Sequence, residues 1–319
     1  MLAGAVAALL VAGIVSVLVV DPRAKEAVVQ GAVVTEWESR SPDPSVYRGL
    51  GAWVDAFDYG PAYHRPWEGP LLGPESVDAL AERGVRTLYL QAARVDPRSP
   101  QGIVDHVLVG RFLERSHQRG LRVVGWYLPK FGNIEADLAN LRLIRDFDFE
   151  GHRFDGIGVD IEWRRDVPDH GERNRRVVEL SERLKSEARG LALAAIVYPP
   201  VLVEAVYPGY WPDFPWSKLA GIYDAWLPMT YWTETTARSG YRDAYRYTAE
   251  SIRLLRARLG DRSPLMHAVG GVAGGSSPED IEGFVRAAQE TGAEGLSVYD
   301  YRTTSAPGWE VLQRATPAE

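Results

Sequence analysis

From Arg48 onward, short apolar runs alternate with longer segments whose apolar residues recur at helical spacing. The runs are rich in β-branched and aromatic residues, which is typical of strands. Eight of them are present, at 49–57, 85–92, 121–129, 154–163, 191–199, 223–232, 264–272 and 295–301. Several intervening segments begin at Ser, Pro or Glu and end at Gly, as helices do. They include 73–84, 107–120, 172–190, 245–260 and 277–292.

This alternation predicts an α/β fold with parallel strands joined by right-handed crossovers. Eight such units in about 270 residues match a (β/α)8 TIM barrel, which typically needs about 250. The alternative is a doubly wound open sheet, which normally has a Gly-rich phosphate turn after its first strand. The stretch "AFDYGPAYHRPWEG" that follows the first run is not such a turn. We therefore expect a closed barrel.

Residues 1–20 form an apolar run without a charged side chain, and the run is long enough to cross a bilayer. It is expected to be a transmembrane anchor or a signal peptide. Arg23 and Lys25 follow it, an arrangement that favours a cytoplasmic remainder, but long domains translocate largely regardless of such charges. We expect a linker at 21–46, a barrel at 47–315, and a location on the extracellular face of the membrane or secreted.

Composition excludes several kinds of site. The formal charge of -7 and the lack of a basic stripe argue against a nucleic-acid partner. The absence of cysteine excludes disulfides, a thiolate nucleophile and cysteine-based metal sites. The six histidines are scattered, so no metal site is predicted. The 10 Trp and 15 Tyr fit two interpretations, sugar stacking and ordinary core packing.

The fourth run, "FDGIGVDIEW", carries two carboxylates in an otherwise apolar strand. A charge in a low-dielectric interior is costly unless it is paired or hydrogen-bonded. Residues two apart on a strand face the same side, so Gly158, Asp160 and Glu162 are expected to share the inner face. Val159 and Ile161 are expected to face the helices. Barrel active sites lie at the carboxyl ends of the strands, which places both acids at the mouth.

Polar and aromatic residues also end the other strands. A carbohydrate site needs this combination, because acids perform the chemistry and flat aromatic faces stack on sugar rings. We therefore expect a polysaccharide or glycan partner at this mouth. The candidate residues besides the strand-four acids are Asp55, Gln91, Tyr127, Tyr198, Tyr231, Trp232, Tyr299 and Asp300.

The stretch "DGIGVDIE", residues 155–162, resembles the D-x-x-D-x-D-x-E signature of the family 18 glycoside hydrolases. That family of barrels includes chitinases and endo-β-N-acetylglucosaminidases. The resemblance implies that Glu162 is the general acid that protonates the glycosidic oxygen. It also implies that Asp160 orients an N-acetyl group of the substrate, whose carbonyl oxygen attacks the anomeric carbon. A neighbouring carboxylate would help to keep the acid protonated.

Two further stretches extend the resemblance. "MTY" resembles the strand-six M-x-Y-D and implies that Tyr231 hydrogen-bonds the reacting group. "GLSVY" resembles the strand-eight G-x-M-x-W and puts Tyr299 at the floor of a sugar subsite. The chain departs from the pattern at Gly158, where the motif has its second Asp, and at Trp232, where it has an Asp. The strand-three S-x-G-G is not evident in "VVGWYLP".

The sequence thus predicts an exported glycoside hydrolase that cleaves a polysaccharide containing amino sugars. Glu162 is the expected acid/base, Asp160 assists, and Tyr231 positions the reacting group. One alternative is a two-carboxylate glycosidase with Asp55 or Asp300 as the second carboxylate. Another is a non-catalytic glycan-binding barrel at the cell wall. No cofactor is expected, because acid/base hydrolysis of acetals needs none.

Structural roles remain open for several of these residues. The strand-four acids have Arg164 as a possible ion-pair partner, and the strand-eight carboxylate has Arg302. Asp55 and Asp58 are nearly as well suited to capping a loop as to touching substrate. His267 is expected to be a packed, hydrogen-bonded histidine. The aromatic loop 207–216 fits a glycan platform and core packing equally.

Overall fold

The computed structural model describes residues 41–65, 69–260, 264–271 and 275–315. The apolar run 1–20 and nearly all of the expected linker lie outside these ranges. Among the described residues, no helix has both the length and the apolar character that crossing a bilayer requires.

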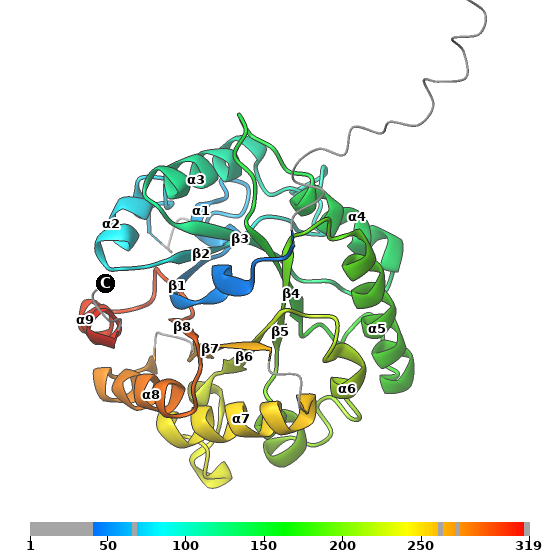
Figure 1. Ribbon diagram of the computed structural model, residues 1–319, viewed down its shortest axis with the longest axis vertical. Helices are drawn as coiled ribbons and strands as arrows, with labels where there is room; N and C mark the ends of the chain where they lie inside the picture. The colour runs from blue at the N-terminus through cyan, green and yellow to red at the C-terminus, as the bar shows by residue number, and fades with distance from the viewer. Residues whose placement is uncertain (1–40, 66–68, 261–263, 272–274, 316–319) are drawn as a thin grey trace, which may run out of the picture.

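Eight parallel strands close into a barrel in chain order, and helices surround it (Figure 1). Each strand lies inside one of the predicted runs, so the predicted barrel is confirmed. The strands are β1 (Gly49–Val54), β2 (Thr87–Gln91), β3 (Arg122–Tyr127), β4 (Gly156–Ile161), β5 (Ala192–Val197), β6 (Ala225–Thr230), β7 (Leu265–Gly270) and β8 (Gly295–Val298).

The helices that follow the strands form the outer layer. The five predicted helical segments correspond to α2, α3, α5, α7 and α8, with ends that differ by a few residues. Side-chain N-caps explain several helix starts, because Asp105, Asn133, Asp169, Asp243 and Ser277 each accept a hydrogen bond from a first-turn amide. The helices are α1 (Ala56–Tyr59), α2 (Ser76–Glu82), α3 (His106–Gln118), α4 (Ile134–Arg145), α5 (His170–Glu187), α6 (Trp216–Leu219), α7 (Ala244–Leu259), α8 (Pro278–Glu290) and α9 (Ala306–Ala315).

The core has two layers, one inside the barrel and one between the barrel and the helices. Along β4 the side chains alternate between them. Val159 and Ile161 pack in the outer layer, whereas Gly158 faces Trp126 and Ile196 of the inner layer. The predicted orientation of this strand is therefore confirmed.

A 3-10 turn, η3 (Pro44–Tyr47), lies across the amino-terminal end of the barrel and is the blue segment near the centre of Figure 1. The Tyr47 hydroxyl donates to the carbonyls of Ile157 (3.0 Å) and Ala192 (2.7 Å). Its own carbonyl lies 2.8 Å from Nδ1 of His267. Residues 44–46, at the end of the expected linker, are thus part of the barrel and close its lower end.

His267 is fully buried in the inner layer. Its Nε2 lies 2.8 Å from the Ser297 hydroxyl, which in turn accepts from the indole of Trp53. Burial lowers the pKa of His267 to about 4, so the ring is neutral at pH 7. A neutral ring that donates from Nδ1 and accepts at Nε2 satisfies both contacts. His267 is the packed, hydrogen-bonded histidine that was predicted.

Tyr47→Phe tests the importance of the turn that closes the barrel. The variant leaves two buried carbonyls without this donor, so the free energy of unfolding is expected to fall by about 1–2 kcal/mol. The matched control is Tyr245→Phe, which removes a hydroxyl that bonds Glu290 at the surface. That change is expected to stay within about 0.5 kcal/mol. Urea unfolding measures both, and equal losses would contradict a structural role for the turn.

Candidate active site

The two strand-four acids lie at the carboxyl end of β4. Asp160 is 7% exposed, and its Oδ1 has no hydrogen-bond partner in the protein. Glu162 is the first residue after the strand, is half-buried, and borders a cavity. The structure therefore places Glu162 at the mouth, as the sequence predicts, whereas Asp160, which was also expected at the mouth, is buried within the barrel.

Burial raises the pKa of both acids. The pKa of Asp160 is well above its ordinary value, first because of burial and then because of the charge of Glu162. Burial also raises the pKa of Glu162, against the opposing effects of the Tyr198 hydroxyl and the Arg164 guanidinium. The two acids titrate as a pair, which holds a proton at a pH where isolated carboxyls are ionised.

Arg164 is held by an aromatic residue. Its guanidinium lies 3.5 Å from the centre of the Tyr210 ring and donates to the Tyr210 carbonyl at 3.2 Å. It influences Glu162 through its charge while stacked on Tyr210. A structural ion pair with Arg164 therefore does not explain why strand β4 carries these two acids.

The cavity beside Glu162 has a volume of about 330 Å³. The ends of β4, β5 and β6, the loop after β5, and α7 line it. Tyrosines make up most of its wall, and two carboxylates are exposed to it. Its lining residues are Glu162, Tyr198, Leu202, Tyr207, Tyr210, Met229, Tyr231, Glu234 and Tyr247.

Three of the predicted site residues meet in this cavity, namely Glu162, Tyr198 and Tyr231. The sequence analysis did not assign the other lining residues to the site. Tyr207 and Tyr210 come from the aromatic loop, which was identified without being resolved into its parts. The two tryptophans of that loop, Trp211 and Trp216, are buried in the outer core. The loop therefore packs part of the outer core and adds two tyrosines to the cavity wall.

Tyr299 and Asp55 join the mouth from the opposite side of the barrel. The ring of Tyr299 lies 6.3 Å from that of Tyr231, and its hydroxyl donates to Oδ2 of Asp55 at 2.7 Å. The other oxygen of Asp55 accepts from the amides of Phe57 (2.7 Å) and Asp58 (3.2 Å), which caps α1. The Asp55 carboxylate thus caps the first turn of α1 and also holds the Tyr299 side chain in place.

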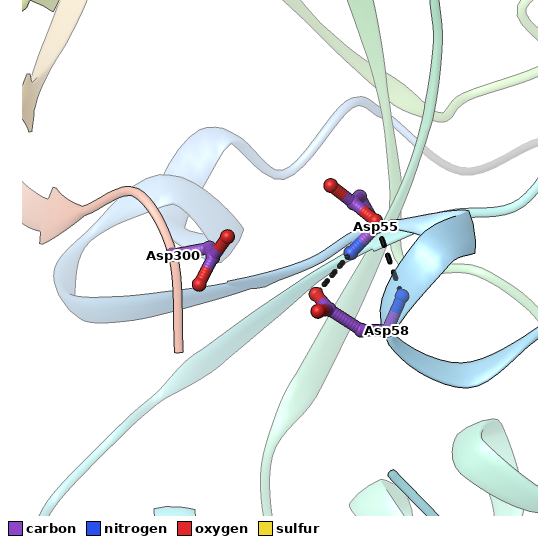
Figure 2. Close-up of side chains that lie close together, drawn as sticks. All are labelled: Asp55, Asp58 and Asp300. Carbon is purple, nitrogen blue, oxygen red and sulfur yellow. Dashed lines mark hydrogen bonds between the residues drawn. The ribbon is translucent and has the colours of Figure 1, made fainter. Parts of the chain in front are cut away.

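Asp55, Asp58 and Asp300 form a second acidic cluster, shown in Figure 2. They offer one oxygen each within 4.8 Å of one another. Asp55 and Asp58 come from the start of α1, and Asp300 comes from the segment after β8. Burial, followed by the charges of Asp55 and Asp300, raises the pKa of Asp58 to about 7.

Protein donors already occupy much of this cluster. Asp58 Oδ1 lies 3.1 Å from Nε of Arg302, and Asp300 Oδ1 accepts from the amide (2.9 Å) and hydroxyl (3.0 Å) of Thr303. Carboxylate oxygens suit hard cations such as Ca²⁺ or Mg²⁺, and these three residues are the ones that would hold such an ion. No contact around them requires one, so the absence of a metal site stays a prediction.

Gln91 serves the scaffold. It is buried, and its Oε1 accepts from the Ala56 amide (3.0 Å) and from Arg94 (2.9 Å). Its side chain thereby ties the end of β2 to the start of α1. Gln91 does not line the cavity beside Glu162.

Tyr127 and Trp232 also lie away from the cavity. The Tyr127 hydroxyl donates to Asp137 at 2.6 Å, and Trp232 packs 5.7 Å from the ring of Phe284. Both belong to the outer core. Since side chains alternate along a strand, an inward Tyr231 turns the next residue outward.

At Gly158, where the motif has its second Asp, neighbouring side chains fill the space that a side chain would need. A Cβ on Gly158 would lie 3.0 Å from Cδ1 of Ile196 and 3.1 Å from Cβ of Trp126. A side chain at this position would require Ile196 or Trp126 to shift by a few tenths of an ångström. Asp155, which stands at the first motif position, lies at the other end of the strand, where it accepts from the Val123 amide at 2.8 Å. In this chain the motif is thus reduced to its last two acids.

No protein-family model and no curated protein matches this chain. Solved structures match by fold. An endo-β-1,4-mannanase from Thermotoga petrophila has a TM-score of 0.62 at 10% identity, over 84% of this chain and 76% of that one. Catalytic domain 2 of a Group II chitinase from Ostrinia furnacalis has a TM-score of 0.58 at 11% identity, over 85% and 96%.

The spore cortex-lytic enzyme SleL of Bacillus cereus has a TM-score of 0.54 at 10% identity, over 87% of this chain and 75% of that one. Identities this low establish the fold alone. The chain therefore shares its barrel fold with these proteins.

Asp58→Asn tests the acidic cluster. A carboxyl whose pKa is raised in the folded state, from 3.8 to about 7, binds more protons folded than unfolded in between. Its contribution to stability is present below about pH 4 and is lost as the pH rises to about 7. The wild type is therefore expected to lose more unfolding free energy over this range than Asp58→Asn does. Urea unfolding measures this slope, with Glu310→Gln on the exposed side of α9 as the control, and equal slopes would refute the raised pKa.

Proposed function

We propose that this protein is a glycoside hydrolase that acts on a polysaccharide containing amino sugars. Glu162 is the general acid/base, Asp160 assists it, and Tyr231 positions the reacting group. One observation carries the proposal: a half-buried Glu162 with a raised pKa borders a tyrosine-lined cavity at the barrel mouth, next to the buried Asp160. The fold shared with chitinases and a mannanase supports it.

The chemistry follows from the proton that the pair holds. Glu162 donates it to the glycosidic oxygen, and the bond between that oxygen and the anomeric carbon breaks. The negative charge left on the pair then faces the positive charge that develops at the anomeric carbon, and this lowers the barrier. A water molecule completes the hydrolysis as Glu162 takes back a proton. The Tyr231 hydroxyl orients the sugar at the reacting centre.

The proposal includes action outside the cytoplasm. The apolar run at residues 1–20 supports it, because an uncharged segment of this length suits membrane anchoring or export. Polysaccharides of the cell surface would then be the accessible substrates.

Glu162→Gln tests the assigned acid. The full-length wild type is expected to release reducing ends from at least one of chitin, peptidoglycan glycan strands and galactosamine-rich exopolysaccharide. The variant is expected to lose activity by about 10²-fold or more, since it has no proton to donate. Glu310→Gln serves as the control for the loss of one carboxylate. Full activity in Glu162→Gln would refute the assignment, and binding without release in the wild type would indicate a non-catalytic glycan-binding barrel.

The pH profile tests the environment of the acid. Because Glu162 must be protonated to act, kcat/KM is expected to fall as the pH rises through its raised pKa. The positive charge of Arg164 lowers that pKa, so Arg164→Gln is expected to move the alkaline limb to higher pH. Arg165→Gln, at the next position, is the control and is expected to leave the limb in place. A limb that moves to lower pH in Arg164→Gln would contradict Glu162 as the titrating acid.

A further inference from the structure

The cavity beside Glu162 has an unusual lining. Five of its nine residues are tyrosines, two are the carboxylates Glu162 and Glu234, and the other two are apolar. No lysine or arginine is among the residues that the structure shows lining it. Its volume of about 330 Å³ falls in the range of small-ligand sites, about 300–1,000 Å³. The space is sufficient for a sugar unit, and its wall is electron-rich.

Tyrosine faces attract cations. A cation within about 6 Å of a ring centre is stabilised by the negative face of the ring. Arg164 shows this at the cavity's own wall, where its guanidinium lies 3.5 Å from the centre of the Tyr210 ring. Glu234, an exposed residue in the 3-10 turn η6 (Trp232–Glu234) after β6, adds a carboxylate at the rim. A cationic group in the cavity therefore lies beside tyrosine rings and the Glu234 carboxylate.

The departures from the motif point in the same direction. The position after Tyr231, a carboxyl in the motif, is Trp232, which packs in the outer core against Phe284. The side chains of Trp126 and Ile196 fill the space beside Gly158. Two of the motif's carboxyls are therefore missing, while the cavity retains a carboxylate at its rim. A neutral N-acetyl group gains little from that rim, whereas an ammonium group gains attraction.

We propose that this cavity binds the free ammonium group of an unacetylated amino sugar. The inference deepens the proposed function and rests on it, because it names the substrate class of the same site. Glu234 and the tyrosine faces select the cationic sugar, and Glu162 is placed beside it for the proton transfer. Glu234 is then a specificity-determining residue.

The test measures binding in full-length protein that carries Glu162→Gln, so that no ligand is cleaved. Calorimetric titration compares three tetrasaccharides with similar backbones: a glucosamine oligomer, its N-acetylated form and cellotetraose. At about pH 6 the glucosamine oligomer is expected to bind about tenfold or more tightly than the other two. This preference is expected to fade as the pH rises past about 8, because the neighbouring oxygens of an amino sugar give its ammonium group a pKa close to that of an α-amino group, about 7.7–8.0.

A second variant tests the rim carboxylate. Adding Glu234→Gln is expected to weaken the glucosamine oligomer about fivefold, as for a solvent-accessible ion pair, and to leave cellotetraose unchanged. Adding Glu310→Gln, which removes a carboxylate from α9, is the matched control and is expected to change neither. Equal effects of the two substitutions would overturn the role of Glu234 and with it the proposal.

The outcomes separate this inference from the proposed function. Tighter or equal binding of the N-acetylated oligomer, or no binding of any oligomer, would overturn the inference. If the wild type also cleaved acetylated polysaccharide, the hydrolase function would survive that result. Preferential binding of the glucosamine oligomer, with no hydrolysis of any substrate by the wild type, would support the inference and refute the hydrolase.

Discussion

Two carboxylates on one inner face of a buried strand are the constraint on which this site depends. Asp160 and Glu162 lie at the carboxyl end of β4, and Asp160 is almost fully buried with an unpartnered oxygen. Ionising both there would place two like charges in a low-dielectric region. The barrel accommodates the pair by keeping a proton on it and by opening Glu162 to a cavity. A stored proton at a solvent-accessible mouth is what general acid catalysis requires.

The rest of the barrel makes this mouth the open end. Tyr47 closes the opposite end through hydrogen bonds to two strand carbonyls. Above it, Trp53 stacks on Tyr89 with ring centres 4.4 Å apart and meets Trp126 edge-on at 5.9 Å. These large side chains fill the interior, and Trp126 also fills the space beside Gly158. The packed floor holds β4 in place and leaves Glu162 facing the cavity.

The sequence was sufficient to predict those features that depend on hydrophobic periodicity and on the chemistry of individual side chains. Alternation along "GVDIEW" was enough to place the two acids on one face, because that face had to hold them near water. The same logic could not decide between Trp126 and Tyr127 or between Tyr231 and Trp232. Adjacent residues at a strand end exchange faces when the register shifts by one, and the register depends on pairing between strands. Here Trp126 pairs with Gly158, which turns the next residue outward.

Other features depend on contacts between distant parts of the chain. Tyr247 lines the cavity from α7. The spacing of apolar residues along that helix predicts only that Tyr247 belongs to the core. The raised pKa of Asp58 needs Asp300, which follows the last strand, and Asp55, which was predicted as a site residue without its link to Tyr299. Sequence reasoning named the three aspartates individually. The fold determines which of them share a proton or a hydrogen bond.

The central claim, that the β4 pair holds a proton at a pH where isolated carboxyls are ionised, is open to direct measurement. Infrared difference spectra at about pH 7 would compare the wild type with Asp160→Asn, after circular dichroism has shown that both fold alike. We expect a protonated-carboxyl stretching band in the wild type that is weaker in the variant, because the variant lacks the buried Asp160 carboxyl, whose pKa burial raises well above its ordinary value. Identical spectra in this region, with both carboxyls ionised in the wild type, would contradict the claim.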